Sequence, residues 1–299
     1  MSSELQYESL EDPGVVERHR RLVALLGSGP ADPVVADLGC GDGATLGELL
    51  ARLGRGGVVV GVDAEAGPLA AAAARFAAEV RAGRLRLLRA DLDGPLPLAG
   101  GSVAAALCHN VLECLRDPDR FLREVHRVLR PGGRLLLSHP DYDTMVFTAP
   151  DLELTRRLVH AYCDTQQDWM VAVNGTIGRW LHDIAARSPF TVGPPTASVV
   201  VSRGWRPPRL GWLFAQHVAA VLRRTGAVSA EEADGWLASM AEVDERGEFL
   251  WTVVDFAVVC HKHPGAGPPG VRPGGPGRSR RRRSPAAPGR ARPAWSAGG

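Results

Sequence analysis

Residues 34–43 read Val-Val-Ala-Asp-Leu-Gly-Cys-Gly-Asp-Gly, and this stretch decides the fold class. Its first part, Val34–Leu38, has the apolar, β-branched character of a short buried strand, and three glycines at alternate positions then form a tight turn. Leucines with the spacing of one helix face follow, at Leu46, Leu49, Leu50 and Leu53. A strand, a glycine turn and a helix in this order are typical of the first unit of a ligand-binding α/β sheet.

The pattern repeats along the chain. Short apolar runs bounded by Gly, Pro or Asp predict further strands over 58–62, 85–88, 103–108 and 135–138. Between the last two, Asp117 can cap a helix that begins with Pro118 and is ended by Pro131-Gly132-Gly133. Alternating strands and helices predict a mostly parallel sheet with helices on both faces.

The regular alternation breaks after Pro140. Residues 141–190 predict a loop followed by helical pieces, which we interpret as a lid insertion over the substrate. A strand over 198–202, helices over 211–224 and 230–245, and a final strand over 249–260 then complete one domain of residues 1–263. We expect the final strand to add antiparallel to the sheet edge.

The chain of 299 residues is 45% hydrophobic and 23% charged, so it can bury a large core. Residues 264–299 carry eight arginines and no acid, together with nine glycines and eight prolines, which predicts a disordered tail. Removing these eight charges from the net charge of +2 leaves −6 for residues 1–263, which makes nucleic acid an unfavourable partner.

The compartment is predicted from the cysteines and from the start of the chain. Five cysteines without a CxxC pair indicate a reducing compartment, and the first residues have no apolar signal region. No apolar stretch approaches the roughly 20 residues of a membrane helix. We therefore expect a cytoplasmic protein without a membrane span.

The glycine turn has the features of a site for a phosphate-free adenosine ligand. It is not a G-x-G-x-x-G dinucleotide fingerprint. Asp37 before the turn and Asp42 within it would repel a pyrophosphate. Asp63 ends the next strand, where it can accept hydrogen bonds from ribose hydroxyls, and Asp91 follows the third strand, where it can accept from an adenine amino group. Spacing alone leaves both NAD and S-adenosylmethionine open.

Four motifs in order resemble class I S-adenosylmethionine-dependent methyltransferases, and especially the group similar to the ubiquinone and menaquinone biosynthesis methyltransferases. The motifs are Val35–Gly43, Gly61-Val62-Asp63, Ala90-Asp91-Leu92 and the helix-turn-strand segment Phe121–Leu135. The resemblance covers about residues 37–140, and more loosely the chain to His263. It implies a Rossmann-like fold, with a mostly parallel seven-stranded sheet and a helical lid, that binds S-adenosyl-L-methionine.

The resemblance also implies a set of cofactor-binding residues. Gly39 and Gly41 would pack against the methionine portion, and Asn110, just past the fourth strand, would flank the sulfonium. The complete set of expected cofactor residues is Asp37, Gly39, Cys40, Gly41, Asp63, Ala64, Asp91, Leu92 and Asn110.

Candidates for catalysis follow the fourth and fifth strands. His109 and His139 stand at strand ends, and histidine is the usual base for removing a proton from an acceptor near neutral pH. Asp141 could bind a cationic amine or orient a hydroxyl, and Glu113 has a weaker claim. Methyl transfer needs no metal, and we predict none. For each of these residues a structural role is the alternative interpretation, and position alone favours it.

The sequence therefore predicts an enzyme that transfers a methyl group from S-adenosylmethionine to O, N or C of a small molecule, with secondary metabolism as one fitting context. Two alternatives stay open: an RNA or protein methyltransferase, and a non-catalytic S-adenosylmethionine-binding protein. After the fourth strand the chain reads Cys108-His109-Asn110-Val111 rather than Asn-Pro-Pro-Tyr or Asp-Pro-Pro-Tyr, which disfavours methylation of base or glutamine amino groups. The acceptor and the oligomeric state are not predicted.

Overall fold

The computed structural model describes residues 10–27, 33–54, 56–171 and 174–264. The predicted disordered tail therefore lies, from residue 265 onward, outside the described residues. Within the described part, no helix is long and apolar enough to cross a membrane.

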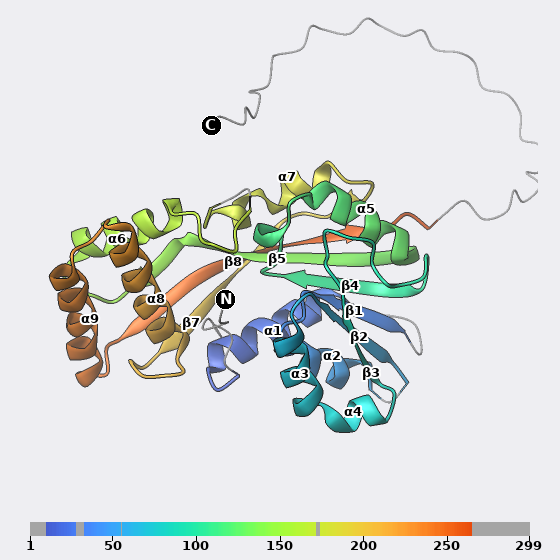
Figure 1. The fold of residues 1–299 in the computed structure, drawn as a ribbon, viewed down its shortest axis with the longest axis horizontal. Helices are drawn as coiled ribbons and strands as arrows, with labels where there is room; N and C mark the ends of the chain where they lie inside the picture. Colours follow the sequence, from blue (N-terminus) through green and yellow to red (C-terminus); the bar gives the residue numbers. More distant parts are fainter. Residues whose placement is uncertain (1–9, 28–32, 55, 172–173, 265–299) are drawn as a thin grey trace, which may run out of the picture. The chain divides into compact units, whose positions relative to one another are not determined.

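The first half of the chain forms the parallel part of one sheet (Figure 1). Its strands pair in the order β3-β2-β1-β4-β5, all parallel, and the order reverses direction beside β1. The elements are β1 (Val34–Leu38), α2 (Leu46–Leu53), β2 (Val58–Asp63), α3 (Ala66–Arg75), α4 (Ala77–Arg81), β3 (Leu85–Arg89) and β4 (Val103–His109). The predicted strands and the α/β class are confirmed.

Helices cover both faces of this parallel part, as expected. On one face, α1 (Pro13–Leu25), α2 and α3 bury their apolar sides against residues such as Val35, Leu107 and Leu136. On the other face, α5 (Pro118–Val128) and α7 (Leu181–Ala186) pack against alternate residues of the same strands, such as Ala36 and Leu137. Neighbouring strand residues point to opposite faces, which produces the two separate cores.

Two long strands extend the sheet beyond its parallel part. They are β5 (Leu129–Phe147) and β8 (Leu250–His261), which pair antiparallel from Arg134↔His261 to Phe147↔Trp251. The last strand is thus antiparallel, as expected, but it lies beside β5 with further strands on its other side.

The prediction that residues 141–147 form a loop is wrong. These residues continue β5 through a register shift between Asp141 and Val146, because β8 supplies a partner strand that the local sequence does not reveal. Pro131-Gly132-Gly133 also lies inside β5, in an irregular stretch just after α5 ends at Val128.

The sheet has eight strands rather than the predicted seven, because its outer strand is split. Two segments lie along β8: β6 (Thr191–Val192) pairs with its end, and β7 (Thr196–Arg203) pairs with its beginning and middle. Gly193-Pro194-Pro195 separates them, and prolines have no N–H to give to a strand ladder.

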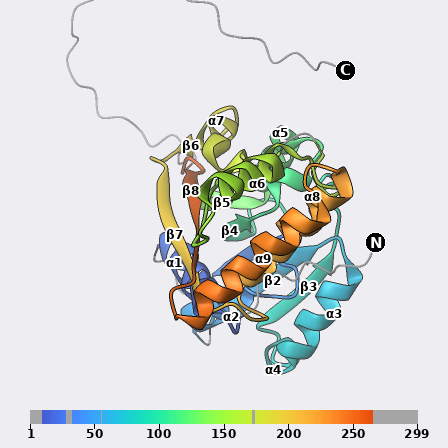
Figure 2. The same cartoon turned by 90° about the vertical axis from the view of Figure 1, so that its left-hand side faces the viewer.

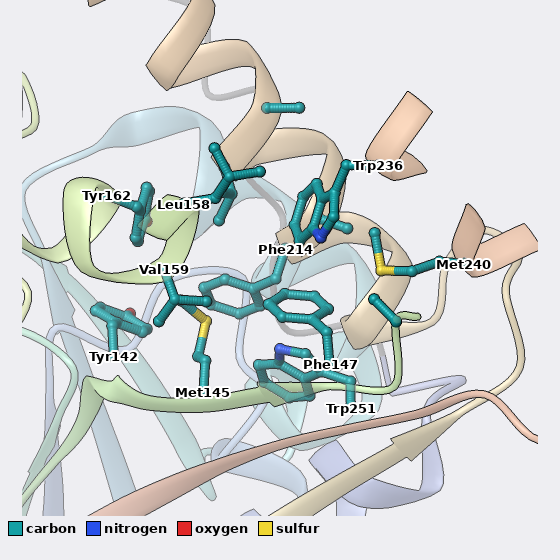
Figure 3. Packing of buried hydrophobic residues seen from close by; sticks show 14 of the residues in the cluster. Tyr142, Met145, Phe147, Leu158, Val159, Tyr162, Phe214, Trp236, Met240 and Trp251 are labelled. Atoms are coloured by element: carbon teal, nitrogen blue, oxygen red, sulfur yellow. The ribbon is translucent and has the colours of Figure 1, made fainter. Parts of the chain in front are cut away.

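The outer halves of β5 and β8 hold a third core with three helices, α6 (Leu152–Asp164), α8 (Leu210–Thr225) and α9 (Ala230–Glu245), which lie on the side facing the viewer in Figure 2. We call this part the antiparallel half. Its centre is aromatic: Phe214 stacks on Trp251 with ring centroids 5.0 Å apart, and Phe147 meets the edge of Trp236 at 5.2 Å (Figure 3).

The predicted single lid over 141–190 divides between two cores. Helix α6 belongs to the antiparallel half, whereas the 3-10 helix η2 (Ile177–Trp180) and α7 pack on the parallel part with α5. The segment therefore contributes to the framework of the domain on both sides of β5.

Candidate functional site

The glycine turn and Asp63 meet at the carboxyl edge of the parallel strands. The Gly41 N–H donates to Asp63 Oδ2 at 2.8 Å, and the Glu65 N–H donates to Oδ1 at 2.9 Å. Each carboxylate oxygen thus holds one backbone donor and keeps a further lone pair. The side chain is partly exposed. The glycine turn and the acid that ends the next strand are therefore in direct contact.

The two leading glycines differ in what surrounds them. At Gly39, with φ +82°, a Cβ atom would lie 2.2 Å from Val111 Cγ2, so the turn packs closely against the residues after β4. At Gly41, with φ +51°, a Cβ atom would have no heavy atom within 4 Å. Gly41 is therefore free of internal packing, and its open side is available to a ligand.

Asn110 has an unusual backbone conformation at the end of β4. Its φ is +57°, and it is the one non-glycine residue with positive φ in the described part of the chain. The Asn110 N–H donates to the Ser138 carbonyl at 2.9 Å, and the Tyr142 hydroxyl donates to Asn110 Oδ1 at 3.3 Å. Such a conformation costs free energy and is common at binding sites.

The remaining cofactor candidates vary in exposure. Asp37 and Cys40 are buried below the turn, with 3% and 6% of their surfaces exposed. Burial, together with the nearby Asp37 carboxylate, raises the pKa of the Cys40 thiol, which keeps it protonated. Ala64 and Asp91 are exposed at the same edge, while Leu92 is buried in the core beneath it.

His109 lies inside the fold, 7% exposed, and meets a histidine that the sequence analysis missed. His19 of α1 faces it edge to face, with ring centroids 5.7 Å apart. His19 Nδ1 in turn lies 2.9 Å from Thr45 Oγ1, directly before α2. Arg18, its neighbour in α1, forms a buried ion pair with Asp255 of β8 at 2.8 Å.

A helix over 13–25 could have been recognised from the sequence. Asp12 is followed by Pro13, and the Asp12 side chain caps the helix by accepting from the Gly14 N–H. Val15, His19 and Leu22 then repeat with helical spacing on the buried side.

Asp141 is fully buried and engaged with a residue that the sequence analysis did not consider. Arg179 of η2 contacts both of its oxygens, with Nε–Oδ2 and Nη2–Oδ1 distances of 2.6 and 2.7 Å. Arg179 also pairs with Asp143 at 2.9 Å. We therefore assign Asp141 to holding η2 against β5, and not to binding a cationic amine or orienting a hydroxyl, because Arg179 already contacts both of its oxygens.

His139 and Glu113 face each other in the interior. Glu113 Oε2 of η1 (Leu112–Cys114) lies 3.5 Å from His139 Nε2, and the two side chains are 4% and 0% exposed. Burial lowers the pKa of His139 to about 3 and raises the pKa of Glu113 to about 7. Trp169 donates its indole N–H to Glu113 Oε1 at 3.0 Å.

Aromatic side chains of the antiparallel half border this acid–base pair. Tyr142 lies edge to face with both His139 and Tyr162, at centroid distances of 6.4 and 6.1 Å. Trp169 lies 5.7 Å from His217 of α8. Gln166 is exposed and donates to the carbonyls of Met170 and Val171.

The parallel part is similar to known methyltransferases. Residues 36–137 match the sequence profile of a family described as "Methyltransferase domain". An uncharacterized 37.1 kDa protein of a Streptomyces fradiae transposon is 38% identical over 170 residues, which cover 56% of this chain and 45% of that protein.

A ubiquinone biosynthesis O-methyltransferase of Pseudomonas paraeruginosa is 34% identical over 112 residues, covering 37% of this chain and 46% of the enzyme. The chain thus spans somewhat less than half the length of either relative. In structure, a provisionally assigned methyltransferase of Bacillus halodurans superposes with a TM-score of 0.54 at 14% identity, over 83% of this chain and 99% of that one. At this identity the likeness shows the shared Rossmann-like fold.

Proposed function

Because residues 36–137 match the family described as "Methyltransferase domain", we propose that the protein transfers a methyl group from S-adenosyl-L-methionine to a small-molecule acceptor. The observation that carries the proposal is the Asp63–Gly41 contact, which joins the ribose-binding acid to the open side of the glycine turn. A carboxylate with spare lone pairs, next to a glycine backbone that no side chain covers, suits a ligand with ribose hydroxyls and no phosphate.

S-adenosylmethionine supplies a methyl group already activated on a sulfonium. The chain's own residues then have to bind, align and exclude water. We assign ribose binding to Asp63, the adenine side to Asp91 with Leu92 and Ala64, and the methionine portion to the turn Gly39-Cys40-Gly41 above Asp37. Asn110, held by Ser138 and Tyr142, lies on the side of the acceptor.

The acceptor side is assigned to the junction between the parallel part and the antiparallel half. Tyr142, Tyr162 and Trp169 line that junction, and the two tyrosine hydroxyls stay neutral because burial raises their pKa values. Such surroundings suit an uncharged, largely apolar small molecule. The similarity to a ubiquinone biosynthesis O-methyltransferase favours oxygen as the methylated atom. The acidic body of the chain disfavours a nucleic acid.

The test is calorimetric titration of the purified, ligand-free chain with S-adenosylmethionine and, separately, with NADH. We expect selective binding of S-adenosylmethionine, and a weakening of about tenfold or more in Asp63→Ala, because a charged acceptor of hydroxyl hydrogen bonds is lost. Asp164→Ala, which removes an exposed aspartate at the end of α6, is the matched control and should bind as the wild type does. Preference for NADH, or an unchanged affinity in Asp63→Ala, would contradict the assignment.

A further inference from the structure

Glu113 and His139 face each other with two hydrogen-bond acceptors and no donor between them. His139 Nδ1 lies 2.8 Å from the Pro140 carbonyl oxygen, which can only accept, so the ring proton is on Nδ1. Nε2 then carries a lone pair, and it points at Glu113 Oε2 over 3.5 Å. Within the described residues, neither of these buried atoms has another hydrogen-bond partner.

One added proton resolves this arrangement. If Glu113 Oε2 is protonated, it can donate to His139 Nε2, while Oε1 continues to accept from the Trp169 indole. If the pair holds no extra proton, a carboxylate and a lone pair face each other in the interior, which is unfavourable. The surroundings hold Glu113 in place from the other side as well, because the Val171 N–H donates to its backbone carbonyl at 3.0 Å.

The pair lies next to the acceptor side of the proposed site. Glu113 lies three residues after Asn110, in the short helix η1. Tyr142 links Asn110 to the pair, because its hydroxyl donates to Asn110 and its ring lies edge to face with His139. The other titratable or charged groups that influence the pair or respond to it are Arg18 of α1, His109 of β4, Cys114 of η1, Tyr142 of β5 and Tyr162 of α6. Of these, Arg18 is already paired with Asp255.

We propose that Glu113 and His139 together form a one-proton site that takes up the proton lost by the methyl acceptor. The inference rests on the proposed function and adds to it that the acceptor is methylated at an atom bearing a proton, such as a hydroxyl oxygen or an amine nitrogen. In the reaction the acceptor's bond to hydrogen breaks and its bond to the methyl carbon forms. The methyl–sulfur bond breaks with its electron pair left on sulfur, and the proton goes to the Glu113 carboxylate.

Electrostatics favours this timing. A sulfonium near the pair opposes protonation of Glu113, and methyl transfer removes that positive charge. The proton affinity of the pair therefore increases in the same step in which the acceptor loses its proton. A glutamate far from the donor site would have no such dependence on the charge of the bound donor.

The first test is the protonation state itself, measured on the full chain without ligand. Infrared difference spectra between pH 5 and pH 9 should contain a protonated-carboxyl band that disappears near neutral pH. The band should be missing in Glu113→Gln and retained in Glu153→Gln, which removes an exposed carboxylate of α6. A spectrum without such a band, or with the same band in Glu113→Gln, would overturn the one-proton site.

The second test is coupling to the donor site, measured by calorimetry at pH 7 in buffers of different ionisation enthalpy. S-adenosylmethionine and S-adenosylhomocysteine have the same shape apart from the methyl group and differ in the sulfur charge. We expect the cationic ligand to release a larger fraction of a proton, and this difference to disappear in Glu113→Gln but not in Glu153→Gln.

The two proposals can fail separately. If neither ligand binds, the proposed function fails, whatever the infrared result. If both ligands bind with equal proton release in the wild type, or if the difference persists in Glu113→Gln, the methyl donor site stands and the role of the pair in proton uptake is wrong. Glu113→Gln is expected to fold, because its amide can donate to His139 and accept from Trp169.

Discussion

The parallel part and the antiparallel half differ in how the carboxylates in and next to their strands are bonded. At the carboxyl edge of the parallel strands, the side chains of Asp63 and Asp91 accept hydrogen bonds from nearby backbone N–H groups, and they are partly exposed and exposed, respectively. Where β5 passes into the antiparallel half, buried carboxylates are paired with arginines from distant segments: Asp141 with the partly exposed Arg179, and Asp255 with the buried Arg18. The first arrangement leaves bonding capacity for a ligand, and the second uses it internally.

The largest effect on stability is expected from a substitution in the aromatic core of the antiparallel half. Trp251→Ala removes a side chain that is 0% exposed and stacked on Phe214, which should cost about 3–5 kcal/mol of stability. We expect one unfolding transition by circular dichroism, shifted as a whole, because β5 and β8 belong to both parts. Trp180→Ala, at a tryptophan that is 43% exposed, is the control with a small effect. Two separate transitions would show that the parts are independent.

The pH dependence of the unfolding free energy tests whether Glu113 is buried with a raised pKa. Its pKa is raised from 4.5 to about 7, so between these values the folded state holds a proton that the unfolded state has lost. Wild-type stability from this group is therefore present at low pH and lost as the pH rises through that window, by at most about 3 kcal/mol. Glu113→Gln lacks this loss. Its unfolding free energy relative to the wild type should rise from pH 5 to pH 8 in urea titrations.

His139 contributes with the opposite sign. Its pKa is lowered from 6.5 to about 3, so stability from its neutral form is lost as the pH falls through that range. This contribution is expected in the wild type and in Glu113→Gln, so the difference between the two proteins isolates the carboxyl group. A difference independent of pH would contradict the raised pKa of Glu113.

Gly41→Ala tests whether the parallel edge is reserved for a ligand. The new Cβ meets nothing in the protein, so the stability cost should be only the backbone strain of about 1–2 kcal/mol, while affinity for S-adenosylmethionine falls about tenfold or more. Gly226→Ala is the matched control in the antiparallel half, at φ +72° and also with no heavy atom within 4 Å. Thermal unfolding and calorimetry should show similar strain in both variants and lost binding only in Gly41→Ala.

Helix caps should show the smallest effect and no contrast between the parts. Asp117→Ala removes the acceptor for the Arg120 N–H in α5, and Ser229→Ala removes half of the capping box of α9. Each change should cost about 1 kcal/mol in urea unfolding. A cost several times larger at one of them would mean that its helix stabilises its part far more than the other does.

The same contrast explains how much the sequence could predict. Strand ends and turns of the parallel part are local patterns, so β1 to β4, the cap at Asp117 and the position of Asp63 at the end of β2 could be predicted from the sequence. The partners in the buried pairs come from distant segments, and no local pattern predicts that Arg179 reaches Asp141 or that Arg18 reaches Asp255.

The prediction of a loop at the end of β5 was wrong for a related reason. Pro140, Asp141 and Asp143 have turn-forming character, and locally that reading is sound. The strand continues because β8 pairs with it and Arg179 neutralises both aspartates. Tertiary partners thus overrode the local preference.

The position of β8 in the sequence has a consequence for biosynthesis. One edge of β5 pairs with β4, but the other edge is matched only when residues 250–261 have left the ribosome. Until then, an apolar strand presents unpaired N–H and C=O groups, and such edges recruit other chains. Nascent chains that stop before residue 250 should therefore depend on chaperones far more than the finished protein does.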